Sequence, residues 1–100
     1  MPKKRIKKAI EFIKNFLEGR GITINKIVLF GSYADNSFKQ NSDVDIAIVS
    51  RDFEKKNIFQ RAKMLKGLDW ALVGRFMLPF DIVPLSLKEW DKSDSLIAEF

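Results

Sequence analysis

The sequence contains no cysteine and no histidine. These two absences exclude thiol nucleophiles, disulfides, thiolate or imidazole metal sites, and every catalytic triad that depends on an imidazole base. Chemistry in this chain has to come from carboxylates, hydroxyls, lysine, arginine, backbone amides or a hard metal ion bound by oxygen. The aspartates are therefore the first candidates for functional residues.

Long apolar runs are also missing. No stretch approaches the roughly 20 apolar residues of a membrane-spanning helix, and the lysine-rich start continues as an amphipathic pattern instead of a signal-peptide core. We therefore expect a cytoplasmic protein with no membrane contact. One hundred residues with 46% hydrophobic content predict a single folded domain over residues 1–100. On so small a domain, a second molecule or a second copy is expected to complete any substrate site.

The net charge of +5 at pH 7 suggests an anionic partner until the charges are located. Five positive charges lie close together at the start of the chain, and the remainder is close to balanced in total. These charges belong to Lys3, Lys4, Arg5, Lys7 and Lys8. Such a cluster commonly marks a solvated helix start. Contact with RNA or another anionic surface is the alternative that the sequence leaves open.

Apolar periodicity predicts the order helix, strand, strand, helix, strand, helix. Steps of three and four from Ile6 to Leu17 predict a first helix that ends at Gly19 and Gly21. The short apolar runs at residues 27–30 and 44–49 predict strands buried on both faces.

Apolar positions from Phe53 to Leu72 predict the second helix, with a weak point at Gly67 and an end at Gly74. Pro79 opens the run PFDIVPL, which predicts a third strand that Pro84 closes. Ser86 or Ser93 is expected to cap a last short helix. The apolar face of that helix would consist of Leu96, Ile97 and Phe100. The expected fold class is α/β of the α+β type, with helices packed on one face of a small mixed sheet.

Two aspartates lie in or beside the second predicted strand. Asp43 and Asp45 are two residues apart, so on a strand their side chains would point to the same face. Because a divalent cation turns the repulsion between two carboxylates into ligation, the pair predicts a metal site. Asp81, inside the sequence FDIV, can add a third carboxylate if its strand lies beside this one. Oxygen ligands alone favour Mg²⁺ or Mn²⁺.

The turn FGSYA precedes this strand and supplies a candidate phosphate site. A strand that ends in Gly31 and Ser32 and then enters a short helical stretch leaves backbone N–H groups free, and glycine lets a phosphate approach closely. A metal site beside a phosphate site is typical of phosphoryl or nucleotidyl transfer. Structural alternatives stay open: an ordinary turn at Gly31 and Ser32, a turn cap at Asp43, and an ion pair with an arginine at Asp81.

At these residues the chain resembles the minimal nucleotidyltransferases of the DNA polymerase β-like superfamily. Their signature is a Gly-Ser pair, a loop, an Asp-x-Asp motif and a later strand that carries a third aspartate. The corresponding residues are Gly31-Ser32, Asp43-Val44-Asp45 and Asp81. The resemblance covers residues 27–85 and implies a polymerase β-like core. It also implies an enzyme that transfers NMP, with AMP from ATP as the favoured case, to a hydroxyl group with release of pyrophosphate.

The resemblance also implies roles for the individual residues. Asp43 and Asp45 would bind both metal ions and the triphosphate. Asp81 would complete the catalytic metal site and help to deprotonate the acceptor. Gly31 and Ser32 would bind the β and γ phosphates. The three aspartates are thus the candidate catalytic and metal-binding residues, with Mg²⁺ or Mn²⁺ as the cofactor.

One part of the family pattern differs in this chain. Relatives commonly carry Arg-Gly where this chain has Asp35-Asn36, so a carboxylate replaces a cation expected to face the phosphates. Lys39, Arg51 or a partner residue would have to compensate for the lost charge. Lys39 is our candidate phosphate-binding cation.

Small members of the family are often paired with a helical HEPN-domain protein as antitoxin and toxin, and the resemblance implies such a partner. Two other interpretations stay open. One is a non-catalytic nucleotide- or partner-binding module that neutralises its partner by occlusion, for which Asp35 is the motivating residue. The other is a small-molecule nucleotidyltransferase that works as a homodimer. Nucleic-acid binding is compatible with the charge but has no motif to indicate it.

Overall fold

The computed structural model describes residues 2–35, 37, 39 and 42–97, with the side chains of residues 2, 3 and 93–97 left out of the description. The elements are α1 (Pro2–Glu18), β1 (Lys26–Phe30), the 3-10 helix η1 (Gly31–Tyr33), β2 (Val44–Val49), the 3-10 helix η2 (Arg51–Phe53), α2 (Ile58–Met64), α3 (Leu68–Phe76), β3 (Phe80–Leu85) and α4 (Leu87–Ile97). The predicted first helix, the three strands and the last helix are therefore confirmed. The expectation that the strand at residues 27–30 is buried on both faces is wrong, because β1 is an edge strand whose residues are half-buried or exposed. No helix in the described part of the chain is long and apolar enough to cross a bilayer.

The three strands form a mixed sheet in the order β1-β2-β3. β1 pairs antiparallel with β2, and β2 pairs parallel with β3. Five of the six residues of the central strand β2 are buried, and the half-buried exception is Asp45. A central strand covered on both faces reads as a continuous apolar run, which explains why residues 44–49 were predictable.

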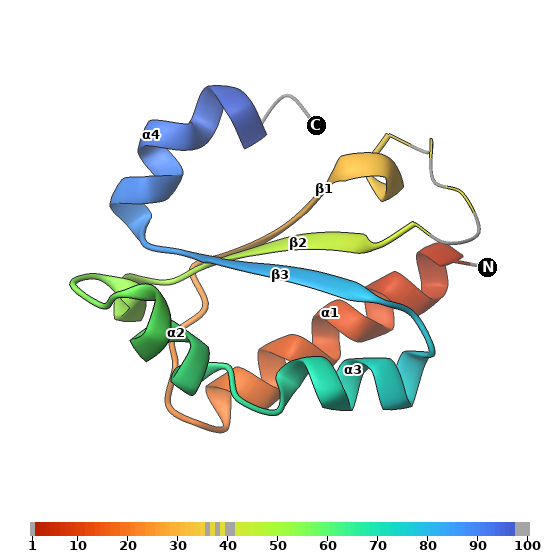
Figure 1. Ribbon diagram of the computed structural model, residues 1–100, viewed down its shortest axis with the longest axis horizontal. Helices are drawn as coiled ribbons and strands as arrows, with labels where there is room; N and C mark the ends of the chain where they lie inside the picture. Colours follow the sequence, from red (N-terminus) through yellow and green to blue (C-terminus); the bar gives the residue numbers. More distant parts are fainter. Residues whose placement is uncertain (1, 36, 38, 40–41, 98–100) are drawn as a thin grey trace.

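Helices α1 and α3 cover one face of this sheet, and α4 lies against the other (Figure 1). The α1 side of the core contains Ile6, Ala9, Ile13 and Leu17, which recur at the spacing of one helix face. They pack in one cluster with Val44, Ile46 and Ile48 of β2 and with Leu68, Leu72 and Phe76 of α3. The fold class is therefore confirmed, with α4 as an addition on the opposite face.

The single helix expected from Phe53 to Leu72 is wrong, because the structure divides this stretch. Residue Gly67 takes a left-handed φ of 88° and separates α2 from α3. Because only glycine adopts this conformation at little cost, the predicted weak point is a complete break. Gly74 does not end the second of these helices, which continues to Phe76 and stops where Met77 has a φ of 56°.

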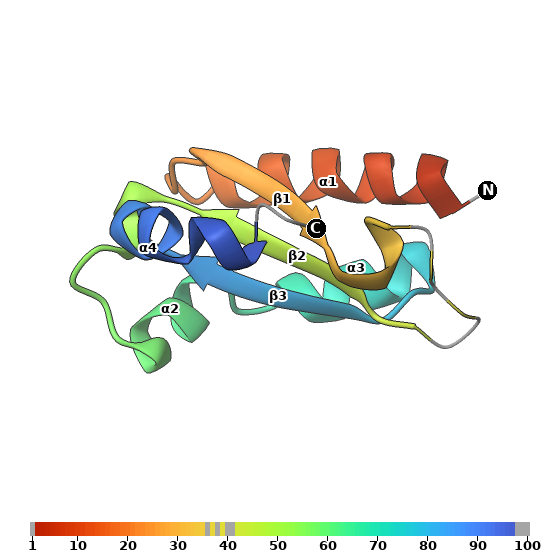
Figure 2. The same cartoon turned by 90° about the horizontal axis from the view of Figure 1, so that it is seen from above.

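Pro84 lies inside β3 instead of closing it. The strand is at the edge of the sheet, where a residue without an N–H group is tolerated. Helix α2 lies beside this edge, as the view from above shows (Figure 2). Arg61 of α2 donates a hydrogen bond from Nη1 to the carbonyl of Pro84 at 3.1 Å, so the carbonyl points away from β2.

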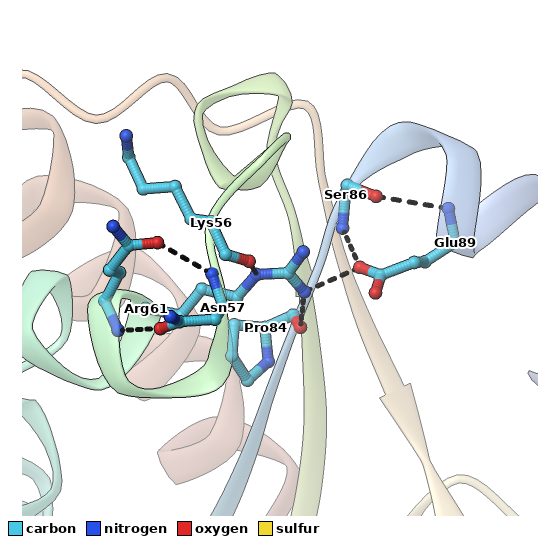
Figure 3. A network of polar contacts seen from close by, with 7 residues as sticks. Lys56, Asn57, Arg61, Pro84, Ser86 and Glu89 are labelled. Atoms are coloured by element: carbon cyan, nitrogen blue, oxygen red, sulfur yellow. Dashed lines mark hydrogen bonds and ion pairs between the residues drawn. The ribbon is translucent and has the colours of Figure 1, made fainter.

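Helix α4 begins with a reciprocal cap formed by Ser86 and Glu89. Ser86 Oγ accepts from the Glu89 N–H at 3.2 Å, and Glu89 Oε1 accepts from the Ser86 N–H at 2.8 Å. The cap is joined to α2 because Arg61 Nη1 lies 2.6 Å from Glu89 Oε1 (Figure 3). Ser86 is thus one of the two predicted caps. The expected apolar face of Leu96, Ile97 and Phe100 and the alternative cap Ser93 lie outside the described side chains.

Candidate active site

Gly31 begins η1 directly after β1 ends at Phe30. Its φ of 74° lies in the left-handed region that favours glycine. A Cβ atom at this position would overlap the carboxylate of Asp45 on the neighbouring strand. Two independent constraints therefore require glycine here, and they place the start of η1 directly against Asp45.

Asp45 is the register partner of Phe30 on one side and of Asp81 on the other. Register partners on adjacent strands point to the same face, so β2 and β3 present two carboxylates side by side. Asp43 lies just before β2, and both Asp43 and Asp81 are exposed. The prediction that the Asp81 strand lies beside the Asp45 strand is confirmed.

The pKa of Asp45 is raised above its ordinary value. Partial burial is the main cause, and the negative charges of Asp81 and Asp43 add to it. No described cation forms an ion pair with these carboxylates, since the ion pair found among the described residues joins Arg61 and Glu89. The fold thus concentrates negative charge at this place without neutralising it.

A divalent cation suits this donor set, because the site offers carboxylate oxygens whose mutual repulsion a cation would relieve. Within the described residues, however, no group of three or more acidic side chains is close enough together to hold a metal ion as it stands. The predicted three-carboxylate cluster of Asp43, Asp45 and Asp81 is therefore brought to one region but not assembled. The metal-ligand roles of these residues remain a prediction.

The other predicted site residues lie around η1. Ser32 is half-buried, and its carbonyl accepts a hydrogen bond from the N–H of Ser37 at 2.9 Å. Lys39 is exposed; its backbone N–H donates to Ser42 Oγ at 2.8 Å. No described acidic side chain forms an ion pair with the Lys39 ammonium group. The phosphate-binding roles of Gly31, Ser32 and Lys39 stay predictions.

Asp35, the residue that departs from the family pattern, is exposed just after η1. Its Oδ1 atom accepts hydrogen bonds from both the N–H and the hydroxyl of Ser37. The side-chain bond from Ser37, followed by the backbone bond, lowers the pKa of Asp35, so this carboxylate stays charged. A second negative group is thus held near the candidate phosphate site.

One acidic residue whose pKa depends on the site, Asp69, was not predicted from the sequence. The pKa of Asp69, near the start of α3, is raised first by burial and second by the charge of Asp81. Asp69 belongs to no motif, and its approach to Asp81 depends on how α3 packs against β3. No signal in the sequence alone could have indicated it.

The family model described as "Polymerase beta, Nucleotidyltransferase" matches residues 11–99, which is most of the chain. The chain therefore belongs to this family of nucleotidyltransferases. The Gly-Ser turn, the Asp-x-Asp strand and the third aspartate all lie inside the matched range.

Three proteins from Methanocaldococcus jannaschii are similar in sequence to this chain. "Putative protein adenylyltransferase MJ0141" is 30% identical over 78 residues, covering 74% of this chain and 72% of the relative. "Putative protein adenylyltransferase MJ1305" is 29% identical over 83 residues, covering 83% of this chain and 54% of the relative. A third, MJ0604, is 46% identical over 46 residues, covering 46% of this chain and 43% of the relative. The chain thus spans about half the length of two of these three proteins.

A solved structure confirms the architecture. The crystal structure of a putative nucleotidyltransferase from Sulfolobus solfataricus superposes with a TM-score of 0.63 and covers 90% of this chain and 77% of its own. Its sequence is 24% identical to this chain, so the likeness concerns the fold. The small mixed sheet with its helices is the fold of a nucleotidyltransferase.

Proposed function

We propose that this chain is a metal-dependent nucleotidyltransferase that transfers AMP from ATP to a hydroxyl group of a protein. Family membership supports nucleotidyl transfer in general, and the names of the three relatives favour adenylyl transfer to protein. The observation that carries the proposal is the position of Asp45. Its carboxylate lies against Gly31 at the start of η1 and is destabilised by burial and by Asp81 and Asp43.

In the proposed reaction the acceptor oxygen forms a bond to the α-phosphorus as the bond to the bridging oxygen of pyrophosphate breaks. Asp81 accepts the proton of the acceptor hydroxyl, and Gly31 and Ser32 contact the β and γ phosphates. Asp43, Asp45 and Asp81 would hold Mg²⁺ or Mn²⁺, which when bound supplies charge neutralisation for the phosphates. Because Gly31 has no side chain, we expect the phosphates to approach its backbone closely, beside the Asp45 carboxylate.

The acceptor proposed from the family resemblance is a HEPN-domain toxin, with this chain as its antitoxin in the cytoplasm. A hydroxyl-bearing partner suits a site whose exposed aspartates, Asp43 and Asp81, lie at the surface and not in a closed cavity. Such a site can act on a hydroxyl group presented by a second protein.

Asp35 favours a second candidate function, a non-catalytic module that neutralises its partner by occlusion. An exposed carboxylate that stays charged beside η1 opposes a triphosphate at the same place. Under this proposal, partner binding would survive the loss of Asp43 and Asp45. The small-molecule alternative that acts as a homodimer has no observation among the described residues in its favour.

The experiment is incubation of the protein with α-phosphate-labelled ATP, Mg²⁺ and a cell lysate, followed by separation of protein, RNA and small molecules. We expect label on protein that falls roughly 100-fold or more in Asp43→Asn and in Asp45→Asn. Asp91→Asn is the matched control, because Asp91 is an exposed aspartate on α4. Equal labelling by the three variants would contradict the mechanism, and label on RNA or a small molecule would contradict the protein acceptor.

A further inference from the structure

The exposed large apolar side chains among the described residues all fall within residues 58–77. Their exposed fractions are 74% for Ile58, 76% for Phe59, 87% for Trp70, 47% for Val73 and 77% for Met77. Single exposed apolar residues are ordinary, but this set gathers on two consecutive helices, α2 and α3. A gathered apolar surface of this kind marks an interaction site.

Helix α3 has a second apolar face beside the one that it buries. Leu68, Leu72 and Phe76 pack into the core, whereas Trp70, Val73 and Met77 form an exposed stripe at steps of three and four. Gly74 lies within this stripe, and a Cβ atom there would meet nothing within 4 Å. The stripe is therefore open to close approach by another backbone.

A groove of about 500 Å³ lies between α2 and the edge strand β3 and reaches the first residues of α3. Its apolar lining residues are Ile58, Phe59, Ala62, Leu65, Ile82 and Pro84. Asp69 also lines the groove and lies one turn before Val73 on α3, which joins the two surfaces. Groove and stripe, which meet at the carboxylate of Asp69, are together called here the α2–α3 surface.

The edge of the sheet beside the groove is closed to an added strand at its far end. Pro84 has no N–H group to donate, and its carbonyl already accepts a hydrogen bond from Arg61. An extended peptide could not continue the sheet past this point. A helix with an apolar face fits an apolar groove and a helical stripe without needing backbone hydrogen bonds.

The charges of this part of the chain favour an acidic partner, although the two charged residues that line the groove, Lys66 and Asp69, have opposite signs. Residues 55–77 contain six lysine and arginine residues and one aspartate, a net charge of +5 that equals that of the whole chain. The positive surplus is therefore not confined to the start of α1, as the sequence alone suggested. Arg61 is paired with Glu89, whereas no described carboxylate forms an ion pair with Lys63 or Lys66.

We infer that the α2–α3 surface binds an amphipathic helix of another protein whose apolar face is flanked by aspartate or glutamate. A second copy of this chain is a poorer occupant, because a symmetric contact would bring the two positive rims together. The inference concerns binding and uses none of Asp43, Asp45 or Asp81, although the groove adjoins the candidate site at Asp69.

The test uses a defined probe, a synthetic helical peptide with leucine on one face and glutamate at its flanks. Its twin carries lysine in place of every glutamate. Titration of each peptide into the ¹⁵N-labelled chain is followed by amide shifts. We expect the shifts for the glutamate peptide to concentrate in residues 58–77 and its binding to be about tenfold tighter or more than that of the lysine twin.

One single variant and one double variant locate the effect, and a second double variant is their control. Trp70→Gln removes the most exposed side chain of the stripe without touching the core, and the double variant Lys63→Glu with Lys66→Glu reverses two positive charges of this part of the chain. We expect each to weaken the glutamate peptide about tenfold or more. The control is Lys8→Glu with Lys14→Glu on the exposed side of α1, which changes the net charge equally and should leave binding within about twofold.

Three results would overturn the inference. The first is the absence of shifts in residues 58–77 with either peptide. The second is equal weakening by the α1 control, which would show a general charge effect. The third is a concentration-dependent dimer that Trp70→Gln abolishes, which would make a second copy the occupant. If Asp43→Asn or Asp45→Asn loses label transfer but binds the glutamate peptide as tightly as the original chain, the α2–α3 surface acts separately from the proposed active site.

Discussion

Two acidic sites lie at opposite ends of β3 and balance their charges differently. After the strand, Glu89 accepts hydrogen bonds from Arg61 Nη1 at 2.6 Å and from the Ser86 N–H at 2.8 Å (Figure 3). Burial alone would raise the pKa of Glu89, but the bonds from Ser86 and Arg61 outweigh it and lower the pKa. At the start of the strand, burial and the charges of Asp81 and Asp43 raise the pKa of Asp45.

The negative charge of Glu89 stabilises the fold, whereas the negative charge of Asp45 does not. Glu89 ties α2, β3 and α4 to one another, so its ionised form stabilises the protein. Asp45 gains no such partner among the described residues, so its ionised form weakens the free protein. Strained or repelling groups of this kind are typical of functional sites.

The largest effect is expected from a side chain at Gly31. Gly31→Ala forces a left-handed φ on alanine and places a methyl group against the Asp45 carboxylate, so we expect a loss of about 2–3 kcal/mol of unfolding free energy. Gly21→Ala is the matched control, because its φ of 79° is similar but a Cβ atom there meets nothing within 4 Å. Its loss should be about 1 kcal/mol. Equal losses in urea unfolding would contradict the close approach of Gly31 to Asp45.

The next largest loss of stability is expected from removing the hydrogen bonds of Arg61 and its ion pair with Glu89. Arg61→Met removes the donor to the carbonyls of Lys56 and Pro84 and to Glu89, and we expect a loss of about 1–2 kcal/mol in urea unfolding. Lys63→Met, an exposed change on the same helix, should stay within about 0.5 kcal/mol. A loss in Arg61→Met no larger than in this control would show that the network is not structural.

Acid should remove the contribution of Glu89. Because its folded pKa lies below the ordinary value of 4.5, its charge stabilises the protein above that pH and ceases to do so as the pH falls through the folded pKa. Glu89→Gln keeps the size and one acceptor but removes the charge. We expect it to cost about 0.5–1 kcal/mol near pH 7 and progressively less as the pH falls below 4.5 and through the folded pKa. A cost that grows in acid would contradict the lowered pKa.

Much of the fold could be predicted because buried apolar residues recur along the sequence in the pattern typical of their helix or strand. The face of α1 from Ile6 to Leu17 and the continuous run of β2 each have one packing environment along their length. The Asp-x-Asp spacing predicted a shared face for Asp43 and Asp45, but β2 begins at Val44, so Asp43 lies just before the strand and its shared face stays a prediction. The register of Asp45 with Asp81 depends on the crossover through α2 and α3, which no local pattern encodes.

The error in the second predicted helix falls at Gly67, which separates α2 from α3. Trp70, Val73 and Met77 are as apolar as Leu68 and Leu72, so periodicity alone could not tell the exposed stripe from the core. One missed signal was present: Asn57 and Gln60 form a capping box at the start of α2, with mutual bonds of 2.8 and 2.9 Å. It would have placed a helix start there.

Thermal unfolding with and without a divalent cation tests the central claim most directly. The proteins are the original chain, Asp45→Asn and the control Asp91→Asn, each in chelator and in saturating Mg²⁺ or Mn²⁺. We expect Asp45→Asn to melt highest in chelator, because it removes the repelling charge, and the other two proteins alone to gain stability with the cation. Two results would contradict a cation site at Asp45. The first is an equal rise in melting temperature with the cation for all three proteins. The second is a melting temperature in chelator that is lowest for Asp45→Asn.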